Sequence, residues 1–269
     1  MRETINTTNE APEIPVEREL SLAKKLEISE AKNKELQEKL EYIKKLFGII
    51  AHDLKGPVNT TTVFTELLSE YIKDGSITME ELADNLDMIY RNSDATSKLL
   101  EDLLTWSRLQ LDEIKPEILA MNLAKEIEIS VAPLLLAMKQ KEIKFENKIP
   151  NDLDILADSN MLQTVVRNLS SNAIKFTNQG GNISISCEKK DNLVEIHITD
   201  DGVGLSEDKV KNLFESTGIS TLGTNEEKGT GFGLSICKEM VEKMGGNIKV
   251  ISEGKSKGTT FIVTLPAGE

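Results

Sequence analysis

The chain has 269 residues, enough for one large domain or two modest ones. Its 45 acidic and 32 basic residues give a formal net charge of −13, which argues against DNA or an anionic membrane as the main partner, because phosphate-rich surfaces are bound by basic ones. Cys187 and Cys237 lie in different predicted elements without a CxxC spacing, so we expect reduced thiols in a cytosolic protein. No run approaches 18 apolar residues and no signal peptide is evident, so the chain is expected to be soluble, either by itself or as the cytoplasmic part of a larger sensor.

The first third of the chain predicts a disordered tail followed by a long helix. Residues 1–16 contain Thr, Asn and two prolines without periodicity. A heptad pattern then develops, weakly at Ser29 and Asn33 and strongly beyond them, so residues 17–35 are predicted to form a coiled-coil signal helix. The strong part of the seam consists of Leu36, Leu40, Ile43, Phe47, Ile50, Leu54, Pro57, Thr61, Phe64, Leu68 and Tyr71.

His52 falls on the side of this helix opposite the seam. The f positions of the heptad are all polar, namely Glu38, Lys45, His52, Asn59 and Glu66. A histidine at f points away from partner helices, so His52 is either an accessible reactive group or an idle surface residue. Asp53 follows it directly, and Pro57 lacks the N–H that would bond to the Asp53 carbonyl, which is expected to loosen the helix around the histidine.

A second helix is predicted from Thr78 to about Leu111. Thr78 and Glu81 form a T-x-x-E capping box after the break at residues 73–76. The apolar stripe of this helix is Leu82, Ile89, Thr96, Leu99, Leu103 and Trp106. Two helices with one apolar stripe each cannot bury both stripes as a lone hairpin, so residues 36–114 are predicted to form a four-helix bundle as a homodimer.

Beyond Lys115-Pro116 the pattern changes to alternating strands and helices. Helices are predicted at 124–138, 160–176, 207–214 and 234–244, and strands at 143–147, 153–157, 183–188, 194–199, 248–252 and 259–265. Because these elements do not alternate as regular β-α-β units, residues 115–269 are predicted to form an α+β sandwich with helices on one face of a mixed sheet.

Polar residues interrupt the apolar pattern of the helix at 160–176. Asn168, Asn172 and Lys175 follow one another at i, i+4 and i+7, which places them on one face. Amide oxygens suit a hard cation such as Mg2+, and an ammonium group suits phosphate. The alternative interpretation of this stripe is a solvated helix face.

Two glycine-rich segments add to this pattern. Gly202 and Gly204 follow a strand and allow a tight turn, with Asp200 or Asp201 beside them, although D-x-G-x-G is also common in ordinary turns. Gly229, Gly231 and Gly233 precede a helix, where backbone N–H groups can bind an anion. No strand comes directly before this triplet and no GxxxxGK[ST] occurs, so neither a dinucleotide fingerprint nor a P-loop is indicated.

In this order, the motifs resemble the transmitter region of a sensor histidine kinase over about residues 36–266. "AHDLKGP" resembles the phosphoacceptor box, "NLSSNAIKFT" the asparagine box, and "DDGVG" the first glycine box. Phe214 resembles a short phenylalanine box, "GTGFGLSICKEMVEKMGG" the second glycine box, and "KGTTF" the last motif. The C-terminal domain would then be an ATPase domain of the gyrase, chaperone, kinase and mismatch-repair superfamily.

The resemblance implies a role for each matching residue. His52 would be the nucleophile, with Asp53 as hydrogen-bond partner or base. Asn172 and Asn168 would hold Mg2+ against the phosphates of ATP, and Lys175 would contact phosphate. Asp200 would accept from the adenine amine in a pocket shaped by Gly202, Gly204 and Thr259, while Gly229, Gly231 and Gly233 would anchor a flexible lid at residues 215–228. His197, which shares a strand face with Glu195 and Thr199, is predicted to be a surface residue.

The implied function is autophosphorylation of His52 by ATP, followed by transfer to an aspartate on the receiver domain of a response regulator, either a separate protein or part of a longer parent chain. Two alternatives remain: another ATPase of the same superfamily, such as a chaperone or serine-directed kinase, or a coiled-coil scaffold that binds nucleotide without transferring phosphate. The chain departs from the family pattern at Gly56, where many members carry Thr or Asn. A Thr hydroxyl or Asn amide at this position could hold a water molecule against the phosphoryl group of a regulator. Gly56 has no such group, so weak phosphatase activity is predicted.

Overall fold

The computed structural model describes residues 16–268 except 215–221, 226 and 228. Residues 1–15 of the predicted disordered tail and most of the predicted lid lie outside these residues, while Val16, the last residue of that tail, begins a helix. The chain divides into two compact units, residues 1–51 and 52–269, which are described separately. Among the described helices, none is both long and apolar enough to span a membrane.

One continuous helix, α1, runs from Val16 to Asp74 and contains Pro57 in its interior. In its C-terminal part, exposure follows the predicted heptad: Leu54, Thr61 and Phe64 are partly buried and Leu68 is 6% exposed, while most intervening residues are exposed. The predicted seam is therefore confirmed from Leu54 to Leu68, in the second unit, but its last member, Tyr71, is 44% exposed in the single chain.

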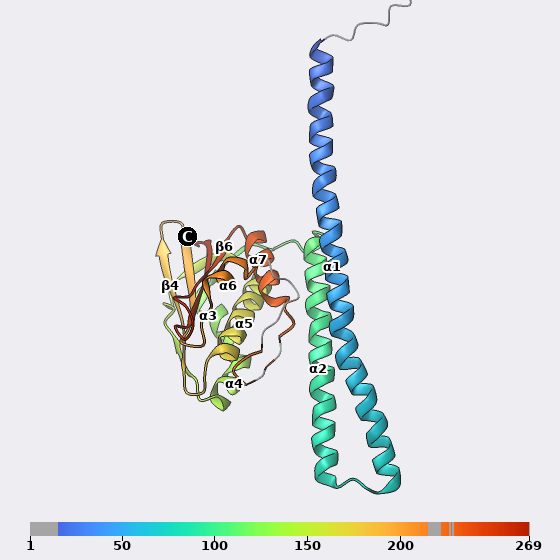
Figure 1. The fold of residues 1–269 in the computed structure, drawn as a ribbon. Coiled ribbons are helices and arrows are strands. Elements are labelled where there is room, and N and C mark those ends of the chain that lie inside the picture. The colour runs from blue at the N-terminus through green and yellow to red at the C-terminus, as the bar shows by residue number, and fades with distance from the viewer. Residues whose placement is uncertain (1–15, 215–221, 226, 228, 269) are drawn as a thin grey trace, which may run out of the picture. The chain divides into compact units, whose positions relative to one another are not determined.

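The second helix, α2 (Met79–Gln110), returns after a short turn, so that α1 and α2 form a helical hairpin (Figure 1). The predicted capping box is present, since Glu81 N donates to Thr78 Oγ1 at 3.2 Å and Thr78 N donates to Glu81 Oε2 at 2.9 Å. On the predicted stripe, Leu99 and Trp106 are buried and the other members are partly buried. The capping box therefore fixes where α2 begins.

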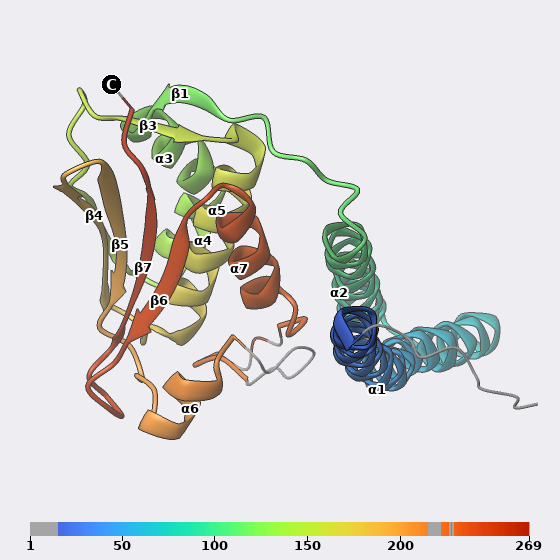
Figure 2. The same ribbon diagram turned by 90° about the horizontal axis from the view of Figure 1, so that it is seen from above.

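The C-terminal domain is a two-layer sandwich. Its main sheet has the order β2-β4-β5-β7-β6, formed by Lys144–Asn147, Asn182–Lys190, Leu193–Asp200, Thr259–Pro266 and Asn247–Ile251. Only the β2–β4 pair is parallel, so the sheet is mixed as predicted. Figure 2 shows α3 (Leu123–Val131), α4 (Leu135–Gln140), α5 (Ser159–Phe176) and α7 (Gly233–Lys243) on one face of this sheet.

Three details differ from the predicted elements. The helix expected at 124–138 is divided into α3, a 3-10 turn at Ala132–Leu134 and α4, because Pro133 cannot continue the N–H ladder of α3. Helix α6 is shorter than predicted, at Glu207–Asn212. A short strand β1 (Leu119–Asn122) pairs with β3 (Asp154–Ala157), and its mostly exposed residues carry no strong strand pattern.

The core lies between α5 and the sheet. One face of α5 is fully buried through Leu162, Val165, Val166 and Leu169, and it packs in the same layer as α7. Burying such side chains contributes roughly 1.5–3 kcal/mol each before entropy is counted. This burial fixes the rotation of α5 and therefore the direction of its polar face.

Candidate functional site

A cavity of about 830 Å3 opens beside α5 and collects residues from the separate motifs. Every residue proposed from the sequence to contact the cofactor lines it except Gly202: Asn168, Asn172, Lys175, Asp200, Gly204, Gly229, Gly231, Gly233 and Thr259. Pro57, Leu99 and Asp102 from the helical hairpin complete part of its wall. Residues as far apart in the sequence as Pro57 and Thr259, 202 positions, thus share one cavity.

The polar stripe of α5 forms one side of the cavity. Asn168, Asn172 and Lys175 are all partly buried, because the opposite side of the helix packs on the sheet. Burial lowers the pKa of Lys175, while the negative charge of Glu227 partly counters that effect. Its ammonium nitrogen lies 4.9 Å from the ring centroid of Phe176. The stripe can therefore offer two amide oxygens to a metal cation and one ammonium group to a phosphate.

Asp200, the last residue of β5, is a buried carboxylate in the same cavity. It is 6% exposed, and its Oδ1 accepts from Gly202 N at 2.9 Å. Burial raises the pKa of Asp200 to about 6, although hydrogen bonds from the Gly202 and Thr259 backbones oppose the rise. Thr259 is its cross-strand neighbour in β7. A carboxylate kept in such a place at a cost to stability is typical of a ligand-binding group.

The glycines after β5 are required by close backbone approach. A Cβ at Gly202 would lie 2.2 Å from Phe176 O, and Gly204 has φ of +64° with its added Cβ only 2.1 Å from Gly254 O. Gly202 therefore lies behind Asp200 rather than on the cavity wall, and it allows the turn to pack against the end of α5. Gly204 shapes the wall itself.

The second glycine segment leads into α7. Gly231 has φ of +78°, and Gly233, the first residue of α7, lies beside Asn168, whose Oδ1 is 3.6 Å from the position of an added Cβ. Between them Phe232 is 1% exposed. The segment is thus held close to the polar stripe of α5.

Contacts with α2 were not foreseen from the sequence. Thr230 Oγ1 donates to Asp102 Oδ2 at 2.5 Å, and the rings of Trp106 and Phe232 are 6.3 Å apart. Burial raises the pKa of Asp102 against the lowering effect of the Thr230 hydrogen bond. A lone aspartate and tryptophan on a helix stripe carry no sequence signal for such contacts.

His52 and Asp53 lie within α1, but their side chains are outside the described part of the chain. Four residues after His52, no atom lies within 4 Å of a Cβ added at Gly56. The backbone there is helical, so a larger side chain at this position has room.

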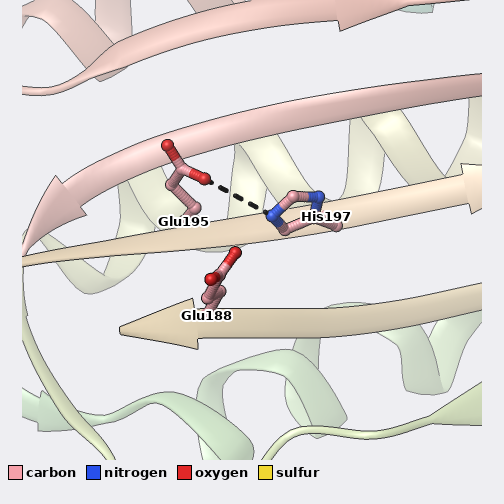
Figure 3. Close-up of side chains that lie close together, drawn as sticks. All are labelled: Glu188, Glu195 and His197. Carbon is pink, nitrogen blue, oxygen red and sulfur yellow. Dashed lines mark ion pairs between the residues drawn. The ribbon is translucent and has the colours of Figure 1, made fainter. Parts of the chain in front are cut away.

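His197 lies away from the cavity. It is on the open face of β5, between the buried Ile196 and Ile198, with its side chain 25% exposed. Figure 3 shows it beside Glu195 and Glu188, with its Nε2 3.7 Å from Glu195 Oε2. The ammonium of Lys190 is 2.8 Å from Glu195 and 3.2 Å from Glu188, so these carboxylates already have a cation between them. His197 thus lies away from the candidate site, but it is partly buried and not the fully exposed surface residue that the sequence predicted.

Comparison with known proteins decides the family. Residues 27–112 match the His Kinase A (phospho-acceptor) domain, and residues 157–269 match the histidine kinase-, DNA gyrase B- and HSP90-like ATPase family. The chain belongs to the sensor histidine kinases. Most residues that line the cavity of this histidine kinase lie within the ATPase match, while His52 lies within the phospho-acceptor match.

Curated relatives agree with this assignment. The adaptive-response sensory kinase SasA of Prochlorococcus marinus (strain MIT 9313) is 31% identical over 260 residues, covering 93% of this chain and 66% of SasA. The sensor protein SrrB of Staphylococcus aureus (strain MRSA252) is 28% identical over 245 residues, covering 86% of this chain and 39% of SrrB. The histidine kinase chain therefore spans less than two thirds of the length of these relatives.

Solved structures share the fold. Histidine kinase ThkA in complex with response regulator protein TrrA has a TM-score of 0.68 at 22% identity, covering 86% of this chain and 64% of that one. The Acinetobacter baumannii histidine kinase AdeS has a TM-score of 0.64 at 20% identity, covering 81% of this chain and 98% of the AdeS chain. These likenesses show that the histidine kinase fold extends through the hairpin and the sandwich.

Proposed function

We propose that this chain transfers the γ-phosphoryl group of ATP to His52 and then to an aspartate of a response regulator. The observation that carries the proposal is the single cavity that gathers the asparagine stripe, Asp200 and the glycine segments. We assign residues 36–114 to dimerisation and phosphotransfer, residues 115–269 to ATP binding, and residues 17–35 to signal transmission.

The chemistry of the cavity fits a nucleotide with Mg2+. Asn172 and Asn168 would hold the ion through their amide oxygens, which are hard ligands of the kind it prefers. When bound, Mg2+ neutralises charge that builds up on the phosphate oxygens during transfer. Lys175 would bind a phosphate oxygen, and Asp200 would accept a hydrogen bond from the adenine amine.

The proposed transfer needs a neutral imidazole at His52. With a reference pKa of about 6.5, most histidine side chains are neutral at pH 7.5 and have a lone pair on one nitrogen. That nitrogen attacks the γ-phosphorus, the bond from phosphorus to the β–γ bridging oxygen breaks, and ADP leaves with the electron pair. Asp53 would accept a hydrogen bond from the imidazole and stabilise the cationic product.

The decisive experiment is to incubate the protein with Mg2+ and ATP labelled at either the γ- or the α-phosphate. We expect label from the γ-position only, bound in a form that is lost in acid and retained in alkali. Acid-stable label would indicate a serine-directed kinase instead, and ATP binding without any label would indicate a nucleotide-binding scaffold.

The hairpin supports a homodimer. Large apolar side chains remain exposed on both helices of a single chain: Val58, Val63, Leu67, Tyr71 and Ile72 on α1, and Leu86, Tyr90, Leu100 and Leu104 on α2. Exposed apolar side chains on both helices of a hairpin favour burial against a second copy of the hairpin. We predict a solution mass of twice 29.8 kDa by light scattering, and a monomer at micromolar concentration would contradict the four-helix bundle.

Gly56 predicts weak phosphatase activity toward the phosphorylated regulator, because it offers no side chain to position water. We expect Gly56→Thr to speed loss of phosphate from purified phospho-regulator, measured with ADP present, by about tenfold or more. A Cβ has room at Gly56 and equally at Gly48, four residues before His52 in the same helix, so Gly48→Thr is the matched control. Fast hydrolysis by the wild type, unchanged by Gly56→Thr, would show that another residue positions the water.

A further inference from the structure

Lys141, just after α4, holds a buried cation beneath the cavity. The residue is 5% exposed, and its Nζ contacts Ile174 O at 2.8 Å, Lys175 O at 3.2 Å and Glu227 Oε1 at 2.9 Å. An ammonium group has three N–H donors, so all of them are used. The Glu227 side chain is 37% exposed, and a partly solvated ion pair of this kind adds little net stability, so stability alone does not explain the pair.

Two of the three acceptors belong to the last turn of α5. The final carbonyls of a helix have no partner within the helix, and a positive charge there is favourable. One of these carbonyls is that of Lys175, whose side chain lines the cavity. The ammonium of Lys141 therefore fixes the backbone from which Lys175 extends.

The third acceptor joins this helix end to residues 222–225 and 227, the part of the predicted lid that the structure describes. Glu227 Oε2 accepts from Asn225 N at 2.8 Å, and Glu227 O accepts from Gly223 N at 2.9 Å, so the segment closes on itself. Thr224 N donates to Lys175 O at 3.0 Å, while the single hydroxyl proton of Thr224 lies between Thr177 O at 2.9 Å and Lys175 O at 3.2 Å. Lys175 O thus receives hydrogen bonds from the Lys141 ammonium and the Thr224 backbone, and the Thr224 side chain also binds the chain just after α5.

Gly223 brings the same segment against the side chain of Lys175. A Cβ at Gly223 would lie 2.5 Å from Lys175 Cγ and 2.3 Å from Glu227 Oε2. The stem of Lys175 therefore runs directly beside the Gly223 backbone. Displacing Glu227 would free both the segment and the stem that it confines.

We propose that Lys141 and Glu227 are positioning residues for the nucleotide site: their ion pair clamps residues 223–225 to the end of α5 and so sets where the Lys175 ammonium meets a phosphate. This inference rests on the proposed function of the cavity as the ATP site. Neither residue needs to touch the nucleotide. Loss of either residue would shift the Lys175 ammonium and so weaken the binding of ATP. The reactivity of the nucleophile His52 would not change.

The test compares Lys141→Met, Glu227→Gln and Lys141→Arg with the wild type, using ATP titrations for dissociation constants and labelling of His52 for apparent KM and maximal rate. We expect Lys141→Met and Glu227→Gln each to raise the dissociation constant and the KM by about tenfold, with the rate at saturating ATP within about twofold. Lys141→Arg should restore most of the affinity. The double variant should be no worse than either single one, because both remove the same clamp.

Lys139→Met is the matched control, since Lys139 is an exposed lysine in α4 only two residues away. If Lys141→Met does not fold, Glu227→Gln still tests the clamp, because Glu227 has a side chain 37% exposed and keeps its shape as Gln. Wild-type ATP affinity in Glu227→Gln, or an equal loss in Lys139→Met, would overturn the inference. Failure of the wild type to bind ATP would instead overturn the proposed function.

Discussion

Asn172→Ala should reduce labelling of the protein by γ-labelled ATP roughly a hundredfold or more, because loss of a metal ligand removes several kcal/mol of charge stabilisation from the transfer. Asn172 is partly buried on the cavity side of α5, and the core face of that helix does not depend on it. The variant should therefore remain folded, with circular dichroism and thermal midpoint close to the wild type.

The matched control is Asn160→Ala, which removes an exposed amide from the first turn of the same helix without touching the cavity. Label incorporation should be unchanged in that variant. Normal labelling of Asn172→Ala at ordinary Mg2+ concentration would remove Asn172 from the site. Recovery of labelling at raised Mg2+ would instead support its role as a ligand.

Asp200→Asn should weaken ATP binding and at the same time stabilise the protein without nucleotide. Loss of a charge-assisted hydrogen bond to the adenine amine is expected to weaken binding roughly 10- to 100-fold. The folded-state pKa of Asp200 is raised from 3.8 to about 6, so its stabilising contribution is present below pH 3.8 and is lost as the pH rises through about 6. At pH 8 the ionised carboxylate then costs on the order of 3 kcal/mol, which a neutral amide avoids.

Thermal unfolding measured from pH 4 to pH 8 checks this expectation. The Asn variant should unfold at a higher temperature than the wild type at pH 8, and the difference should shrink toward pH 4. Asp201→Asn is the control, because the neighbouring carboxylate is exposed and accepts hydrogen bonds from Asn182. A lower midpoint for Asp200→Asn at pH 8 would show that the charge at Asp200 stabilises the fold.

The sequence predicted those parts of the fold that depend on local pattern. The capping box at Thr78, the stripe of α2 and the polar face of α5 are each set by side chains within a few turns of one another. Strand β1 was missed because it is defined by pairing with β3 rather than by its own residues. The break at Pro133 was a missed signal, since proline disrupts a helix from within.

In the candidate site, too, residues in local motifs could be predicted, while contacts between distant residues could not. Its asparagines, glycines and Asp200 stand in recognisable spacings, so they could be predicted to come together. The contact of Lys141 with Glu227 joins residues 86 positions apart, and a lysine just after a short helix carries no sign that it will be buried. The raised pKa of Asp200 likewise comes from burial that only the folded chain creates.

The chain contains two histidines, which makes one measurement especially direct. Wild type, His52→Gln and His197→Gln are incubated with Mg2+ and γ-labelled ATP, and ATP binding is measured in parallel. Binding should be equal in all three, and acid-labile label should appear in the wild type and in His197→Gln but be absent from His52→Gln. Label retained by His52→Gln, or lost from His197→Gln with its ATP binding intact, would contradict the assignment of His52 as the phosphoacceptor.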